Sequence, residues 1–184
     1  EKLIKSFSGP VIIDEAYGEF SNSSVLRLVK KYPNLFLVKT LSKAFGLAGL
    51  RIGYMIADKK FTEIFSNVIQ YPYPLNTIAI ECGILALEKS KQITSIFETI
   101  KKQRTRIIQN LRKYDAFDVF DSNANFVLFD AKGADTRVYN ALIEQGISIR
   151  KLGKLASHKG CLRVTIGTSD MNSKFLLAIR DLLE

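Results

Sequence analysis

The chain has 184 residues, enough for one ordinary domain or for a piece of a larger one. Apolar residues make up 47% and charged residues 24%, which predicts a packed core and excludes a disordered chain. No apolar run approaches the roughly 18 residues of a membrane span, and no secretory signal is visible. The first residue is Glu1 rather than Met, so we expect the numbering to open inside a longer protein.

The formal net charge is +9, and a basic excess can indicate binding to nucleic acid. Here the Lys and Arg residues are scattered, and their densest run, residues 101–106, follows a helical pattern typical of a solvated face. We therefore expect small anionic ligands, and neither nucleic acid nor a membrane as a partner.

The first 70 residues alternate between strand and helix patterns. Short apolar runs typical of strands buried in a parallel sheet occur at residues 10–13, 35–38 and 51–57. A helix is predicted from Ser23 or Ser24 to about Tyr32, and another from a cap at Asp58 to about Gln70. This order predicts an α/β layer with a mostly parallel sheet.

Two closely spaced prolines, Pro72 and Pro74, then interrupt the pattern, because neither can lie inside a helix. We place a domain boundary there, which divides the chain into residues 1–73 and 74–184. The second part is predicted to be a smaller α+β unit. Its helices are expected at residues 75–89, 91–113, 135–145 and from 170, and its strands at 117–120, 126–129, 147–150 and 162–166.

The cysteines and the single histidine show no metal-binding pattern. Cys82 and Cys161 stand far apart, and His158 has no Cys or His at ligand spacing. We expect two reduced structural thiols, a histidine in a surface loop, and no metal site.

Three groups of polar residues follow the ends of predicted strands, where α/β sheets bind ligands. They are Asp14 with Tyr17, then Thr40, Ser42 and Lys43, and finally Arg51. Together they suit pyridoxal 5'-phosphate (PLP). A lysine amine bonds its aldehyde, a carboxylate keeps its ring nitrogen protonated, and a phenol donates to its ring oxygen. Hydroxyls and an arginine fork suit its phosphate.

Each group alone has another interpretation. Asp14 and Glu15 after an apolar strand are also typical of a magnesium site in nucleotide-hydrolysing proteins, although no Gly-x-x-x-x-Gly-Lys-Ser/Thr loop accompanies them. Ser42 and Lys43 form a common dipeptide, and Arg51 taken singly could be a surface charge. The conjunction of all three groups favours PLP binding.

The chain resembles the fold-type I PLP-dependent enzymes of the class I and II aminotransferases over essentially its whole length. The resemblance is carried by residues 11–17, 39–54, 122–126, 147–150 and 162–168. It implies that residues 1–73 are the C-terminal half of a PLP-binding large domain and residues 74–184 a small C-terminal domain. Within the class, the chain most resembles the histidinol-phosphate aminotransferases. That implies transamination of histidinol phosphate with 2-oxoglutarate or glutamate in histidine biosynthesis, by a cytoplasmic homodimer.

The resemblance also implies residue roles. Lys43 would bond PLP and move a proton between the substrate α-carbon and the cofactor. Asp14 would pair with the ring nitrogen and Tyr17 with the ring oxygen, while Thr40, Ser42 and Arg51 would hold the phosphate. Arg163 would bind the substrate α-carboxylate and Arg150 the substrate phosphate, with an exposed strand-end charge as the alternative for Arg150. Asn125 would lie near the site.

Relatives carry about half of the large domain before the point where this chain starts, and that part supplies further cofactor contacts. We therefore expect the chain by itself to bind PLP weakly and to be inactive. Three alternatives stay open: a threonine-phosphate decarboxylase, an aromatic or aspartate aminotransferase, and the aminotransferase-like effector domain of a transcription regulator.

Overall fold

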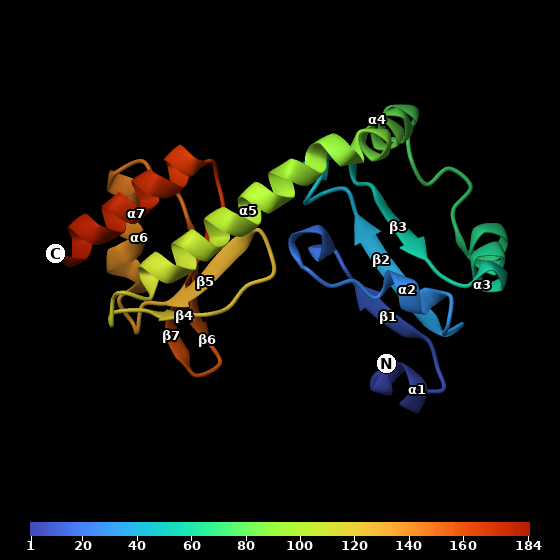
Figure 1. The fold of residues 1–184 in the computed structure, drawn as a ribbon, viewed down its shortest axis with the longest axis horizontal. Helices are drawn as coiled ribbons and strands as arrows, with labels where there is room; N and C mark the ends of the chain where they lie inside the picture. Colours follow the sequence, from blue (N-terminus) through green and yellow to red (C-terminus); the bar gives the residue numbers. More distant parts are fainter. The chain divides into compact units, whose positions relative to one another are not determined.

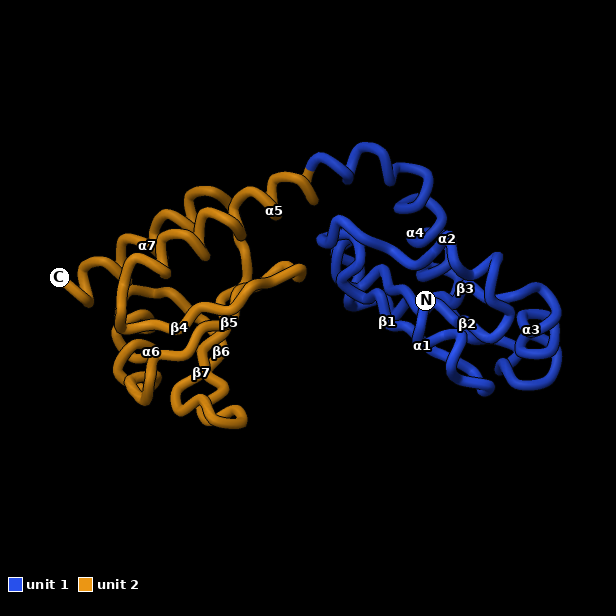
Figure 2. The backbone as a smooth tube through the Cα atoms, turned by 60° about the horizontal axis from the view of Figure 1, so that its bottom comes forward, with its two compact units in different colours: residues 1–95 blue, residues 96–184 orange.

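The computed structural model describes residues 1–184, which form two compact units, Glu1–Ser95 and Ile96–Glu184 (Figure 2). Figure 1 labels the helices and strands of both units. None of the helices combines the length and the apolar composition needed to cross a membrane.

Unit 1 is built on a three-stranded sheet with the order β1-β2-β3 (Figure 1). β1 (Val11–Asp14) runs parallel to β2 (Leu35–Thr40), and β3 (Gly53–Ile56) runs antiparallel to β2. The three predicted strands are therefore confirmed. Leu35 and Leu37 of β2 are fully buried against Val11, Ile4 and Val29, whereas Ile12 of β1 is 68% exposed, so the first strand is less buried than expected.

Short helical segments connect these strands: α1 (Lys2–Ser6), η1 (Gly18–Phe20), α2 (Leu26–Val29) and η2 (Ala48–Leu50). α2 is shorter than the predicted helix from Ser23 or Ser24 to Tyr32. The carboxylate of Glu15 accepts hydrogen bonds from the Ser24 hydroxyl (2.8 Å) and the Val25 backbone N–H (2.7 Å). These bonds hold residues 24 and 25 outside the helix, so α2 starts only at Leu26.

The next helix begins where the sequence predicts, because Asp58 accepts a hydrogen bond from the Lys60 N–H (3.0 Å) as its cap. It comprises α3 (Lys59–Ile64) and a π-helical turn, η3 (Phe65–Ile69). α4 (Thr77–Glu88) follows and is capped by Asn76.

No helix crosses Pro72 or Pro74, as their chemistry requires. The compact units, however, divide between Ser95 and Ile96, inside α5 (Ser90–Leu111). The domain boundary expected after residue 73 lies in a non-helical segment of unit 1. It stays a prediction.

Unit 2 is an antiparallel sheet with the order β4-β5-β7-β6, packed against helices (Figure 1). The strands are β4 (Asp118–Val119), β5 (Phe126–Asp130), β6 (Arg150–Leu155) and β7 (His158–Thr165). The helices are α5, α6 (Asp135–Glu144) and α7 (Ser169–Leu183). Alternate strand residues join helix residues in one core, which includes Val127, Phe129, Leu162, Ile107, Leu111, Leu142, Phe175 and Ile179.

The hairpin of β6 and β7 corrects two predictions. The strand expected at residues 147–150 begins only at Arg150 and continues to Leu155, and β7 begins at His158 rather than at Leu162. Residues 150–155 are mostly exposed, so the hairpin carries no regular apolar alternation to reveal it. His158 is therefore a strand residue, whereas a surface loop was expected.

Asp130, at the end of β5, holds this hairpin through a buried carboxylate that is only 4% exposed. It accepts hydrogen bonds from the backbone N–H groups of Lys132 (2.9 Å), Lys159 (3.3 Å) and Gly160 (2.8 Å), and lies 3.1 Å from His158 Nδ1. Burial opposes ionisation, but these donors outweigh it and hold the pKa of Asp130 below its ordinary value.

Replacing Asp130 by Asn should lower the free energy of unfolding by about 2 kcal/mol near neutral pH, because an amide group would face backbone donors. Since the folded-state pKa is depressed, the contribution of Asp130 is present above its unfolded pKa and is lost as pH falls through the folded value. The difference in the free energy of unfolding between wild type and variant should therefore become smaller as the pH is lowered. Urea unfolding of the full-length protein at several pH values measures this.

Asp170→Asn is the control, because Asp170 pairs with Lys174 on the exposed side of α7 and should contribute little. An Asp130→Asn variant as stable as this control would contradict the assigned role.

Candidate active site

The topology of unit 1 brings the three predicted groups to one edge of the sheet. β1 and β2 are parallel, so Asp14, the last residue of β1, and Thr40, the last residue of β2, lie at the same edge. β3 is antiparallel and starts at this edge, because Gly53 pairs with Thr40. Arg51, just before β3, therefore reaches the edge from the opposite chain direction.

The segment after β1 brings Tyr17 next to Lys43. Asp14 Oδ1 accepts a hydrogen bond from the Ala16 N–H (2.8 Å), which turns the chain out of the strand. Residues 15–18 then form a tight turn that includes Tyr17 and is closed by a bond from the Gly18 N–H to the Glu15 carbonyl (2.9 Å). The Nζ atom of Lys43 lies 5.5 Å from the centre of the Tyr17 ring. A cation and an aromatic ring at this separation attract each other.

Hydrogen bonds and apolar packing hold the loop that carries Lys43 in place. The Thr40 hydroxyl donates to the Ile52 carbonyl (3.0 Å) and accepts from the Ser42 N–H (3.0 Å). Leu41 is 1% exposed and packs with Ile52, which anchors the loop to the unit. Lys43, in contrast, is exposed, so its amine faces outward from a fixed loop.

Arg51 has a left-handed backbone, with φ 57° and ψ 41°. Such a conformation is uncommon for a residue other than glycine and is often found at functional sites. One guanidinium nitrogen donates to the Ala48 carbonyl (3.1 Å), and the side chain is otherwise exposed. The remaining N–H groups are therefore accessible to an anion.

In unit 2, the structure places Arg150 and Arg163 directly opposite each other on β6 and β7. Leu162 and Val164 on either side of Arg163 belong to the helix-covered core, so Arg163 points to the other face of the sheet. Its guanidinium carbon lies 4.9 Å from the centre of the Phe126 ring.

The Nε atom of Arg163 is buried and has no hydrogen-bond partner. An unpaired buried donor is costly, and like charges on facing strand positions repel each other. A bound anion would relieve both, so these two arginines are candidate anion ligands.

Asn125 lies just before β5, where its backbone carbonyl accepts a hydrogen bond from the Ile166 N–H (2.8 Å). The carbonyl of the preceding residue, Ala124, accepts from the buried Arg104 (2.8 Å). Arg104 thus supports this loop from α5, and its burial lowers its pKa. The sequence offered no signal for this role, because Arg104 belongs to the basic run read as a solvated face.

A second group that sequence reasoning missed is Lys39 with Glu15 and Glu19. The Nζ atom of Lys39 lies 2.9 Å from Glu19 Oε1 and 3.4 Å from Glu15 Oε2, and all three side chains are largely buried. The only available signal is a charged residue directly after a predicted strand.

Asp118, Asp130 and His158 bring potential metal-ligand atoms within 4.8 Å of one another. The Asp118 carboxylate, however, lies 3.1 Å from the Lys132 ammonium, and the Asp130 oxygens accept the N–H bonds described above. These donors already satisfy the carboxylates, so we assign the cluster a structural role.

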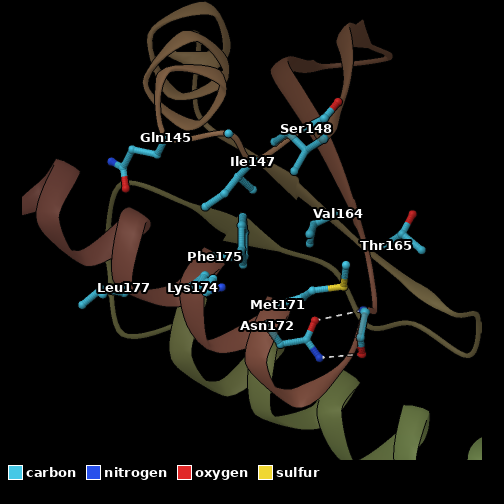
Figure 3. A pocket seen from close by; sticks show the side chains of 13 residues that line it. Gln145, Ile147, Ser148, Val164, Thr165, Met171, Asn172, Lys174, Phe175 and Leu177 are labelled. Carbon is cyan, nitrogen blue, oxygen red and sulfur yellow. Dashed lines mark hydrogen bonds between the residues drawn. The ribbon is translucent and has the colours of Figure 1, made fainter.

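A pocket of about 680 Å³ lies in unit 2 between residues 145–149, the end of β7, and α7 (Figure 3). Its wall includes the apolar side chains of Ile147, Val164 and Phe175. Asn172 closes one end by bonding both the N–H and the carbonyl of Gly167 (3.0 Å each). Val164 belongs to the helix-covered face, opposite the face of the sheet that carries Arg163.

The curated proteins that resemble the chain include histidinol-phosphate aminotransferases. The chain is 34% identical over 182 residues to the histidinol-phosphate aminotransferase of Thermoanaerobacter pseudethanolicus, covering 99% of this chain and 51% of that protein. It is 40% identical over 182 residues to the histidinol-phosphate aminotransferase of Flavobacterium psychrophilum, covering 98% and 52%. The chain thus spans about half the length of the curated relatives it matches.

Solved structures agree with the expected fold class. The histidinol-phosphate aminotransferase from Clostridium acetobutylicum superposes with a TM-score of 0.83 at 29% identity, over 98% of this chain and 56% of that one. The L-threonine-O-3-phosphate decarboxylase from Porphyromonas gingivalis gives 0.79 at 26% identity, over 94% and 54%. Residues 1–179 match the aminotransferase class I and II family. The chain therefore belongs to the class I and II aminotransferases, with the fold of their fold-type I PLP-dependent members.

Proposed function

We propose that this chain is part of a PLP-dependent aminotransferase that transfers the amino group between histidinol phosphate and the 2-oxoglutarate/glutamate pair. The observation that carries the proposal is the exposed amine of Lys43 beside the Tyr17 ring, at the sheet edge that also holds Asp14 and Arg51. The names of the relatives support the substrate. We further propose that the full-length protein is a cytoplasmic homodimer.

The residues of unit 1 fit PLP as a cofactor, and a related structure from Sinorhizobium meliloti, 25% identical, is in complex with it. Asp14 keeps one carboxylate oxygen free for the ring nitrogen, since Oδ1 alone is used by Ala16. The Tyr17 phenol would donate to the ring oxygen. Ser42 and Arg51 would hold the phosphate through a hydroxyl and a guanidinium. Bound PLP supplies an electron sink for the substrate α-carbon.

Thr40 supports this site differently from the other residues. The resemblance implies a phosphate contact, but its hydroxyl hydrogen is directed to the Ile52 carbonyl here. We propose that Thr40 mainly shapes the loop that presents Ser42 and Lys43.

Lys43 would act as the general base and acid once the substrate is bound. Its Nζ atom would accept the proton from the substrate α-carbon and return it to the cofactor carbon. The Tyr17 ring beside Nζ would keep the amine directed at this edge of the sheet. The substrate α-carbon and the cofactor carbon must both lie within reach of the Lys43 amine. A loop held in one position keeps the amine at that place.

Arg163 and Arg150 would bind the anionic groups of the two proposed substrates: Arg163 the α-carboxylate of glutamate or 2-oxoglutarate, and Arg150 the phosphate of histidinol phosphate. The buried, unpartnered Nε of Arg163 suits a carboxylate that reaches the sheet surface, and Arg150 stands on the exposed neighbouring strand. A planar fork binds a carboxylate or a phosphate better than a lysine point charge does.

Arg163→Ala should impair every substrate that carries an α-carboxylate, such as glutamate or an aromatic amino acid. Arg150→Ala should selectively impair phosphorylated substrates, by about ten- to a hundred-fold in kcat/KM, as expected for hydrogen bonds to a charged group. The measurement compares histidinol phosphate with an unphosphorylated aromatic amino acid in the full-length enzyme.

Arg137→Ala serves as the control, because Arg137 is an exposed residue of α6. Equal losses for both substrates in Arg150→Ala would remove Arg150 as the phosphate ligand. The aminotransferase proposal would then still rest on Lys43 and Asp14.

The second candidate function is decarboxylation of a phosphorylated amino acid. It is favoured by the similarity to the decarboxylase from Porphyromonas gingivalis. The same Lys43 and the same two arginines would serve it, so the reaction product decides. Release of CO₂ from threonine phosphate, without formation of a keto product from histidinol phosphate, would favour this candidate.

A further inference from the structure

The charged cluster of Lys39, Glu15 and Glu19 lies at the strand ends that carry the candidate cofactor residues. Lys39 stands next to Thr40 in β2, and Glu15 stands next to Asp14 at the end of β1. Glu15 and Glu19 flank the turn that carries Tyr17. The Lys39 ammonium, 14% exposed, therefore joins the turn of Tyr17 to the strand that leads into Lys43.

Backbone and side-chain bonds together fix this turn to the sheet. Beyond β1, the bond from the Glu15 N–H to the Val38 carbonyl (2.9 Å) ties the segment to β2. The Glu15 carboxylate then reaches forward to Ser24 and Val25, so one side chain connects the start and the end of the turn. Lys39 adds the connection from this carboxylate to β2.

The turn is also packed closely around the cluster. A Cβ atom at Gly18 would lie 3.1 Å from Glu15 Oε2 and 3.4 Å from Lys39 Nζ, so glycine is the residue that leaves these groups their space. Burial alone would lower the pKa of Lys39, but Glu19 and Glu15 outweigh it and raise that pKa, which keeps the ammonium charged. Tyr54, the cross-strand neighbour of Lys39, has its pKa raised by burial and faces the same charges.

We propose that Lys39, bridging Glu15 and Glu19, is a positioning residue that holds the segment of Asp14 and Tyr17 in register with the loop of Lys43. This inference rests on the proposed PLP-dependent function. Loss of the ammonium leaves two largely buried carboxylates facing each other, and Glu19 Oε2 already has no partner. Their repulsion would open the turn and move Tyr17 away from Lys43.

The test compares Lys39→Met, Lys39→Arg and Glu19→Gln in the full-length protein. Lys31→Met is the matched control, because Lys31 pairs with Glu1 at an exposed position of the same unit. Thermal unfolding of the apoproteins first sets a temperature at which every variant is folded. PLP dissociation constants are then measured there, together with the pH midpoint of the bound-cofactor absorbance band.

Lys39→Met should weaken PLP binding by about tenfold or more, as for the loss of hydrogen bonds to charged groups, while Lys39→Arg should restore most of the affinity. The pH midpoint should rise in Lys39→Met, because the lost positive charge favours the protonated Lys43–cofactor linkage. It should fall in Glu19→Gln, where a negative charge is lost. If Lys39 had only a structural role, its replacement would change the unfolding temperature. It would change neither the PLP dissociation constant nor the pH midpoint of the absorbance band.

A folded Lys39→Met variant that matches Lys31→Met in both values would overturn the inference. If Lys39→Met does not fold, Glu19→Gln decides: an unchanged affinity and midpoint would overturn it. Failure of the proposed function is seen separately, in the wild-type protein, as absence of PLP binding or as reductive labelling of a lysine other than Lys43.

Discussion

Replacing Lys43 by Ala in the full-length protein is expected to lower transamination by about 10⁴-fold or more, because both the covalent attachment point and the proton carrier are lost. The structure supports this size of effect. Lys43 is exposed on a loop anchored by Leu41, and its Nζ atom lies 5.5 Å from the centre of the Tyr17 ring.

Two variants separate chemistry from charge. Lys43→Arg keeps a cation beside Tyr17 but cannot bond PLP, so it should be as inactive as Lys43→Ala. Lys60→Ala, an exposed residue of α3, should retain wild-type turnover. Reduction of the PLP-bound protein with borohydride, followed by peptide mapping, measures the attachment directly. A label on any other lysine would end the assignment.

Replacing Asp14 by Asn is expected to lower turnover by about 10³-fold or more, with the fold intact, because the ring nitrogen would lose the charge that keeps it protonated. The fold should survive for a local reason. Asp14 uses Oδ1 to accept the bond from Ala16, and the amide oxygen of Asn can accept the same bond. The variant therefore changes the charge at this edge of the sheet while keeping the turn.

Steady-state kinetics and thermal unfolding of Asp14→Asn measure the two parts of this prediction. Glu63→Gln is the control, because Glu63 forms an exposed pair with Lys59 on α3. Near-normal turnover in Asp14→Asn would remove it as the partner of the ring nitrogen. A large loss of stability would instead indicate that the carboxylate supports the turn.

The elements predicted from the sequence with success are those whose signal is local. The apolar runs at residues 11–13 and 35–38 form strands as expected, and Leu35, Phe36 and Leu37 of the second run are buried. Asp58 starts its helix as expected, and the prolines at residues 72 and 74 lie outside helices. The bounds of the β6 and β7 strands differ from the prediction because the exposed strand β6 carries charged residues rather than an apolar alternation.

By itself, then, the sequence determined the fold class, the family, and the set of groups at the strand ends around Lys43. Those depend on residue type and spacing along the chain. Only the tertiary structure decided the antiparallel direction of β3, which brings Arg51 to the edge of Asp14 and Thr40. It also decided the register that sets Arg150 opposite Arg163, and the burial of Lys39 between two carboxylates. Strand direction, register and burial are set by packing between residues far apart in sequence, which no local pattern encodes.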